Sequence, residues 1–108
     1  MAKITFKRSG GFVGRGMRFE LNLNSLPIST VWKITRLVED ARFFDLPENL
    51  IKKFKPDEYQ YTITVDAGIT YHTVYTNDST MPNSLRLLVN ELTLLSSATQ
   101  EVNMQGLR

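Results

Sequence analysis

The sequence contains no cysteine. This absence excludes a disulfide framework, a thiolate nucleophile and thiolate metal ligands, and it fits a reducing compartment. No stretch approaches the roughly 20 consecutive apolar residues that a membrane-spanning helix requires, and the first residues contain no apolar core of signal-peptide length. We therefore expect a cytoplasmic protein without a membrane partner.

Histidine is almost absent, because His72 is the only one. A Ser–His–acid or Cys–His system needs a histidine base, and a catalytic zinc site needs about three protein ligands. His72 lies in an expected strand among threonines and tyrosines, so we interpret it as structural. The adjacent acids Glu39–Asp40 and Asp57–Glu58 point in diverging directions and do not form a general acid/base pair. We expect no enzyme, no catalytic residue, no metal and no cofactor.

Glycine is scarce outside one segment: four of the six glycines lie in "RSGGFVGRG", Arg8 to Gly16, around Phe12 and Val13. The same part of the chain is basic. Residues 1–54 carry ten Lys or Arg against five acids, while residues 55–108 carry three against six, which gives +5 and −3 and a net charge of +2. The cations Lys3, Lys7, Arg8, Arg15 and Arg18 all precede the first acid, Glu20. An anionic partner surface is favoured there.

Apolar periodicity predicts four strands and two helices. Alternation over residues 4–7 and 17–24 predicts two strands, and alternation over 59–66 and 69–76 predicts a second hairpin. Apolar residues at helical spacing predict a helix after Pro27, with Ser29 or Thr30 as its cap, and another after Pro82. The sequence predicts an α+β fold of the ββαββα type, in which two helices pack on one face of a four-stranded antiparallel sheet.

The pattern leaves the strand order open. It predicts a single domain over residues 1–96 and a polar tail over residues 97–108 that is a candidate for disorder.

The glycine-rich segment reads as a hairpin connection. Its eight residues, Ser9 to Gly16, exceed what a tight turn needs, and such long connections are often binding elements. Gly11 and Gly16 have the spacing of a phosphate-binding loop, but Met17 and Arg18 follow them and a strand replaces the helix, so that interpretation fails. A small basic module that binds nucleic acid or another anion stays as the alternative function, although a net charge of +2 is modest for it.

Recognition of another protein is the remaining interpretation of this segment. An apolar side chain between glycines can enter a cleft in an extended conformation, with Arg8 and Arg15 at its border. On physical grounds alone, burial of Phe12 in the protein's own core is an equally good interpretation. The predicted contact residues are Arg8, Ser9, Gly10, Gly11, Phe12, Val13, Gly14 and Arg15. A competing second contact contains Phe43, Phe44, Lys52 and Lys53, although core packing is the favoured interpretation of "FFDLP".

Five motifs in order resemble the emfourin family of small proteins that inhibit protealysin-like, thermolysin-type (M4) zinc metallopeptidases. They are "RSGGFVG" (residues 8–14), "FFDLP" (43–47), "DEYQYTITV" (57–65), "YHTV" (71–74) and "LRLLV" (85–89). The resemblance implies a cytoplasmic bacterial inhibitor that is a monomer when free and has a peptidase as its partner. It also implies that Phe12 occupies the pocket for the bulky apolar residue after the scissile bond, so that the loop obstructs the cleft.

Overall fold

The structure is a computed structural model that describes residues 3–11 and 16–106, with the backbone alone for residues 98–106. The strands are β1 (Lys3–Gly10), β2 (Met17–Asn22), β3 (Tyr59–Asp66) and β4 (Tyr71–Asn77). The helices are α1 (Ile28–Asp40) and α2 (Asn83–Gly106), and two short 3-10 turns are η1 (Leu23–Ser25) and η2 (Phe43–Asp45). This order confirms the predicted ββαββα fold.

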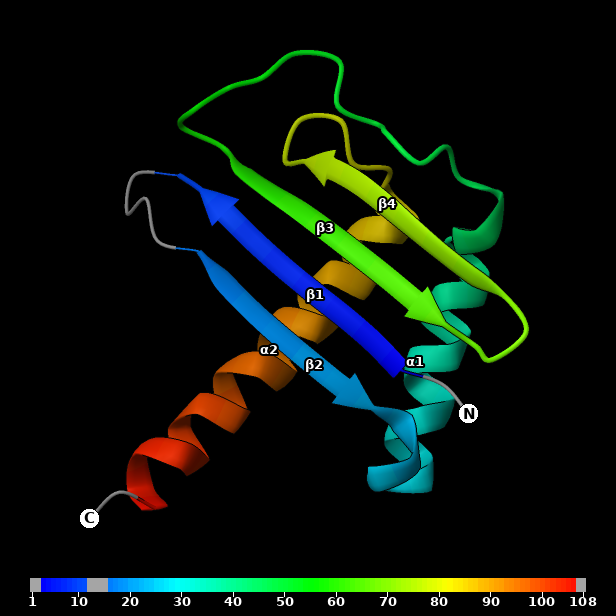
Figure 1. The fold of residues 1–108 in the computed structure, drawn as a ribbon, viewed down its shortest axis with the longest axis vertical. Helices are drawn as coiled ribbons and strands as arrows, with labels where there is room; N and C mark the ends of the chain where they lie inside the picture. The colour runs from blue at the N-terminus through cyan, green and yellow to red at the C-terminus, as the bar shows by residue number, and fades with distance from the viewer. Residues whose placement is uncertain (1–2, 12–15, 107–108) are drawn as a thin grey trace.

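All four strands form one antiparallel sheet in the order β2-β1-β3-β4. The first strand of each hairpin therefore lies in the centre, and the second strand lies at an edge. Both helices lie behind the same face of the sheet (Figure 1), and they contact each other there. The sheet and the helices form two layers with one core between them.

The alternation of residues along the strands decides which face is buried. Phe6 of β1 and Ile63 of β3 are paired neighbours with no exposed surface, and they face the helices. The helices contribute Ile34 and Leu88, which are also fully buried. Residues one position along, such as Lys7 and Thr62, lie on the opposite face, which no helix covers. The sheet therefore has one apolar face and one polar face, as antiparallel sheets commonly do.

The two edges of the sheet differ. Along β4, the Tyr75 N–H donates to the Glu48 carbonyl at 2.7 Å, and the Leu50 N–H donates to the Tyr75 carbonyl at 2.8 Å. This short parallel bridge at Asn49 occupies the outer edge of β4 at Tyr75. Within residues 3–11 and 16–106, no segment pairs with the outer edge of β2.

The structure corrects the predicted start of α1. Its N-cap is Pro27, which makes no side-chain capping bond, and Ser29 and Thr30 lie inside the helix. The Pro27 carbonyl accepts hydrogen bonds from Thr30 and Val31, and the fixed φ of proline favours this entry into a helix. Strand β4 begins at Tyr71, two residues after the predicted start, because Ala67–Thr70 form the turn.

Helix α2 continues past residue 96 to Gly106. The division into a domain of residues 1–96 and a tail of residues 97–108 stays a prediction. In the described chain, neither helix combines the length and the apolar character that crossing a membrane would require.

Candidate functional site

The glycine-rich connection leaves the sheet at the end where β1 stops and β2 starts (Figure 1). Strand β1 pairs with β2 only as far as Arg8 opposite Met17, but it pairs with β3 as far as Gly10 opposite Tyr59. The start of the connection is therefore held by β3. Arg8, Ser9, Gly10 and Gly11 belong to this described base, whereas Phe12, Val13, Gly14 and Arg15 lie outside the described residues.

Gly10 and Gly11 adopt φ angles of +84° and +72°, a region that residues with a side chain rarely occupy. A Cβ atom on Gly10 would lie 2.8 Å from the Glu58 carbonyl oxygen, and one on Gly11 would lie 2.9 Å from the Tyr59 ring. The Gly11 N–H donates to the Glu58 carbonyl at 3.2 Å. Both glycines are thus required by conformation and by close packing, and they set the direction in which the connection leaves the sheet.

Arg8 packs on the sheet next to these glycines. Its guanidinium carbon lies 4.5 Å from the centre of the Tyr59 ring, which is cation–π geometry. Such a contact contributes about 0.5–1 kcal/mol at an exposed site. Tyr59 therefore supports both Gly11 and Arg8, a role that its place in an alternating strand pattern does not reveal.

Asp78 fixes the start of β3 from the turn after β4. One carboxylate oxygen accepts the Tyr59 N–H at 3.0 Å. The other accepts the Tyr61 hydroxyl at 2.8 Å and an Arg86 N–H at 3.2 Å. Burial, reinforced by the hydrogen bond to Asp78 and its charge, raises the pKa of Tyr61 to about 12. The strand that carries the loop base is thereby tied to β4 and to the first turns of α2.

Two further bonds join this end of the sheet to the connector before β3. The Ser79 N–H donates to a Glu58 carboxylate oxygen at 2.9 Å, and the Asn77 side-chain amide donates to the Lys53 carbonyl at 3.1 Å. Segments far apart in the sequence therefore converge on the base of the glycine-rich connection. The polar turn "NDST" (residues 77–80) is the local signal that could have indicated a hydrogen-bonded structure there.

The second predicted surface is divided between core and solvent. Phe43 is only 1% exposed, and its ring packs edge-to-face on Phe44 at 5.8 Å and on His72 at 5.6 Å. The His72 Nε2–H donates to the Leu46 carbonyl at 2.7 Å, which agrees with its predicted structural role. Phe44 is 37% exposed. In this conformation Phe44 is accessible to a partner, and Phe43 is not.

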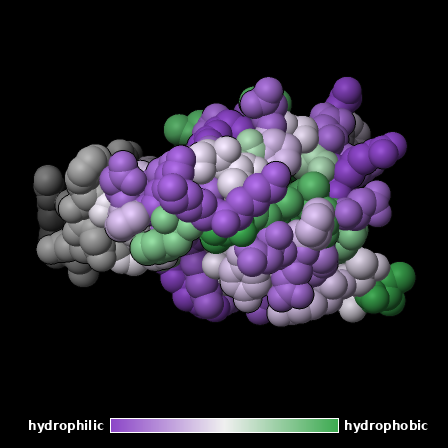
Figure 2. Space-filling view, turned by 90° about the horizontal axis from the view of Figure 1, so that it is seen from above, coloured by the Kyte–Doolittle hydropathy of each residue, from purple (hydrophilic) through white to green (hydrophobic). Residues whose placement is uncertain are grey.

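Lys52 and Lys53 are exposed but lie at the other end of β4. The connector contacts β4 near His72 through Leu46 and near Asn77 through Lys53. Five residues of strand separate these points, which is roughly 16 Å at the usual rise per residue. The structure therefore does not bring Phe44 and the two lysines into one compact patch. The side seen from above in Figure 2 is largely hydrophilic, with smaller hydrophobic areas between.

The chemistry available at the base of the connection is binding. Its groups are backbone amides, an arginine on a tyrosine ring and a hydrogen-bonded aspartate, with no nucleophile paired to a base. Among the described residues, no group of three or more His, Asp or Glu side chains is placed to hold a metal ion.

Comparison with known protein families gives a match over most of the chain. The family model described as Emfourin matches residues 6–93. The matched region begins within β1 and ends within α2, so it contains strands β2, β3 and β4, most of β1 and the base of the glycine-rich connection. No curated protein and no solved structure matches the chain.

Proposed function

Because this chain belongs to the emfourin family, we propose that it inhibits a thermolysin-like, protealysin-like zinc metallopeptidase of the M4 class by obstructing its active-site cleft. Family membership implies a protease-inhibitor role. The class of peptidase, the obstruction of the cleft and the contact residues are the proposal. We expect the inhibitor to be cytoplasmic and to be a monomer when free. Its expected partner is one peptidase.

The observation that carries the proposal is the fixed base of the glycine-rich connection. Gly10 and Gly11 pack against Glu58 and Tyr59, and Asp78 holds the Tyr59 backbone in turn. A loop that starts from a rigid base loses less conformational entropy when it binds, so more of its contact energy appears as affinity. The support is thus built at the position from which a binding loop would project.

In this proposal Phe12 enters the pocket that takes the apolar residue after the scissile bond. Burial of one phenylalanine contributes roughly 1.5–3 kcal/mol. The segment from Ser9 to Gly16 contains no cysteine, histidine or carboxylate, so it offers no side-chain zinc ligand. Obstruction of the cleft is therefore favoured over removal of the metal. Arg8 supports the loop through its contact with Tyr59.

The test is a titration of a protealysin-like peptidase, and of thermolysin in parallel, while peptide cleavage is followed. We expect saturable loss of cleavage near equimolar inhibitor, with one zinc per peptidase still present in the isolated complex. Undiminished cleavage by both enzymes with the inhibitor in large excess would overturn the proposal. If the peptidase loses its zinc on inhibition, the mechanism is removal of the metal and not obstruction of the cleft.

Substitutions at the second predicted surface and in the loop should affect inhibition differently, which distinguishes the two candidate contacts. If the loop is the contact, Phe44→Ala and the pair Lys52→Ala and Lys53→Ala leave inhibition unchanged. If these variants weaken inhibition while Phe12→Ala does not, the contact lies along β4 and the loop assignment is wrong. Thermal unfolding of each variant separates lost contacts from lost folding.

A further inference from the structure

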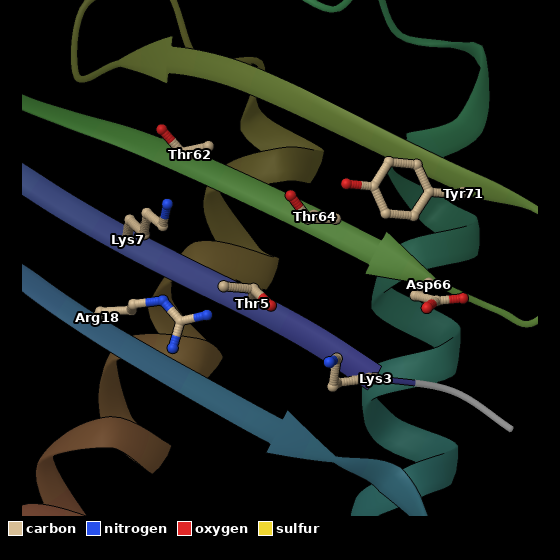
Figure 3. A pocket seen from close by; sticks show the side chains of 8 residues that line it. All are labelled: Lys3, Thr5, Lys7, Arg18, Thr62, Thr64, Asp66 and Tyr71. Atoms are coloured by element: carbon tan, nitrogen blue, oxygen red, sulfur yellow. The ribbon is translucent and has the colours of Figure 1, made fainter.

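The face of the sheet that the helices leave open contains a shallow groove of about 250 Å³. Figure 3 shows its side chains on the side of the sheet away from α1 and α2. Three cations and three hydroxyl groups line most of it: Lys3, Lys7, Arg18, Thr5, Thr62 and Thr64. Ammonium, guanidinium and hydroxyl groups are donors that suit an anionic ligand.

Two of these cations are in positions that are unfavourable for the stability of the sheet. Lys7 of β1 and Arg18 of β2 are directly opposite each other in the antiparallel register. Like charges in directly opposite positions destabilise a sheet, in the range of roughly 0.2–1 kcal/mol for such pairs. An anion between the two side chains would remove this repulsion.

The groove has too little negative charge of its own to do so. Glu20 accepts a hydrogen bond from Arg18 at 2.7 Å and lies 3.8 Å from the Lys3 ammonium. The hydrogen bond from Arg18 and the two positive charges hold the pKa of Glu20 below its usual value, so this carboxylate is already committed. Over the described part of the chain, Lys7 takes part in no ion pair.

This cationic surface is continuous with the base of the glycine-rich connection. A neighbouring hollow is lined by Arg8, Ser9 and Gly16 together with residues of the groove. The two share Lys7, Arg18 and Thr62. A partner that binds the connection would therefore meet Lys7 and Arg18 next.

We infer that the groove beside the glycine-rich connection is a second contact of the inhibitor, at which Lys7 and Arg18 bind carboxylates on an acidic surface beside the peptidase cleft. This inference rests on the proposed function. The Lys7 ammonium and the Arg18 guanidinium donate to a carboxylate placed between them, and the Thr62 hydroxyl adds a third donor. Because the groove is open to solvent, the contact acts on the rate of association and on the choice of partner more than on the lifetime of the complex.

Discrete carboxylates fit this groove better than a nucleic-acid backbone does. Asp66 lies at one end of the groove, and Glu20 stands between Lys3 and Arg18. A continuous line of phosphates along the groove would meet both acids, whereas single carboxylates can bind at Lys7 and Arg18 alone. Binding of a phosphate backbone needs several cations without interleaved acids.

The experiment measures association and dissociation rates between the inhibitor and the protealysin-like peptidase at several salt concentrations. The variants are Lys7→Glu, Arg18→Glu and the double variant. Arg36→Glu is the matched control, because Arg36 is an exposed arginine on α1 with its own acidic neighbour, Asp40. We expect each single variant to slow association roughly tenfold at low salt, the double variant to slow it more, and dissociation to change little.

The salt dependence of association is the second readout. It should be steep for the wild type and for Arg36→Glu, and shallow or reversed for the double variant. If the wild type inhibits and the groove variants keep its rates and salt dependence, the groove inference is wrong and the proposed function stands. If the wild type does not inhibit, the proposed function fails and this inference with it. Salt-dependent retention on single-stranded DNA that the double variant loses, with unchanged inhibition, would assign the groove to nucleic acid instead.

Discussion

The two hairpins of the sheet end in opposite ways. Between β3 and β4, the Ala67 N–H donates to the Thr70 carbonyl at 2.8 Å, and the Gly68 N–H donates to the Asp66 carboxylate at 3.0 Å. Between β1 and β2, the last paired residues are Arg8 and Met17, so the connection spans residues 9–16. The β3–β4 hairpin closes through a short hydrogen-bonded turn of residues 67–70, whereas the β1–β2 hairpin adds chain that strand pairing does not need.

Both connections contain a glycine with positive φ, but in different surroundings. Gly68 has a φ of +92°, and a Cβ atom there would meet nothing within 4 Å. Gly10 has a φ of +84°, and a Cβ atom there would collide with the Glu58 backbone. The short turn only reverses the chain, whereas the long connection is also clamped to β3. The comparison indicates that the β1–β2 end is built to hold a loop in place.

The largest contrast is expected in inhibition. Phe12→Ala should weaken inhibition roughly 10- to 150-fold, because the loop loses the burial of one phenylalanine in the peptidase. Ile69→Ala is the control, since Ile69 is a fully exposed apolar residue in the other connection. Inhibition constants measured with the same peptidase and substrate give both values. Equal effects of the two substitutions would remove the functional difference between the hairpins.

The next contrast concerns stability. Gly68→Ala should cost about 1 kcal/mol, because alanine is strained at positive φ. Gly10→Ala should cost about 2–3 kcal/mol, because the Glu58 carbonyl must also move. The two φ angles are nearly equal, so the difference measures the close approach to β3. Urea unfolding of both variants checks this, and equal free energies of unfolding would contradict the clamp.

A smaller effect is expected at Tyr61, which hydrogen-bonds to Asp78 at the loop end of the sheet. Since the pKa of Tyr61 in the folded protein is raised to about 12, unfolded chains lose this proton near pH 10 while folded chains keep it. Stability is therefore undiminished below pH 10 and falls between pH 10 and pH 12. Tyr61→Phe should cost about 1 kcal/mol at pH 8 and flatten that fall.

Urea midpoints from pH 8 to pH 12 measure the effect. Tyr71→Phe is the control, because Tyr71 is exposed at the opposite end of the sheet. If the stability of Tyr61→Phe decreases between pH 10 and pH 12 as steeply as that of the wild type, other groups cause the decrease.

The smallest effect is expected at the short turn. Asp66→Ala removes the acceptor of the Gly68 N–H and should cost about 0.5–1 kcal/mol, because the bond is exposed. Asp66→Asn keeps an acceptor and should cost less. Inhibition should not weaken in either variant, because the removed charge lies at the far end of the groove. Thermal unfolding together with the peptidase assay separates the two readouts.

The fold could be predicted from the sequence where buried and exposed residues alternate regularly along a strand. Ile4 and Phe6, like Ile63 and Val65, alternate with polar residues because one face of each strand is buried and the other is not. The strand order could not be predicted, because either hairpin could supply the central strands with the same pattern. The predicted cap at Ser29 or Thr30 was wrong. The N-cap is Pro27, and a proline is a weaker capping signal in a sequence than a nearby serine or threonine.

The candidate site could be predicted only in part. The cluster of glycines marked the connection, but contacts with partners distant in sequence decide which glycines are constrained. Tyr59 supports Gly11 from 48 positions along the chain, and Asp78 supports Tyr59 from 19 positions further. No local pattern carries such contacts. Phe43 and Phe44 are neighbours in the sequence and both rings lie near His72, yet only the folded structure shows that Phe43 is buried and Phe44 is partly exposed.

The covered edge of β4 also limits how the sheet could grow. Fibril formation by stacking of strands requires each chain to offer two free edges, one to accept a neighbour and one to pass the pairing on. In this chain the segment around Asn49 occupies one of the two. Strand-to-strand association of folded molecules through β2 would therefore meet, on the far side of the sheet, an edge already occupied at Tyr75, which disfavours growth into a polymer.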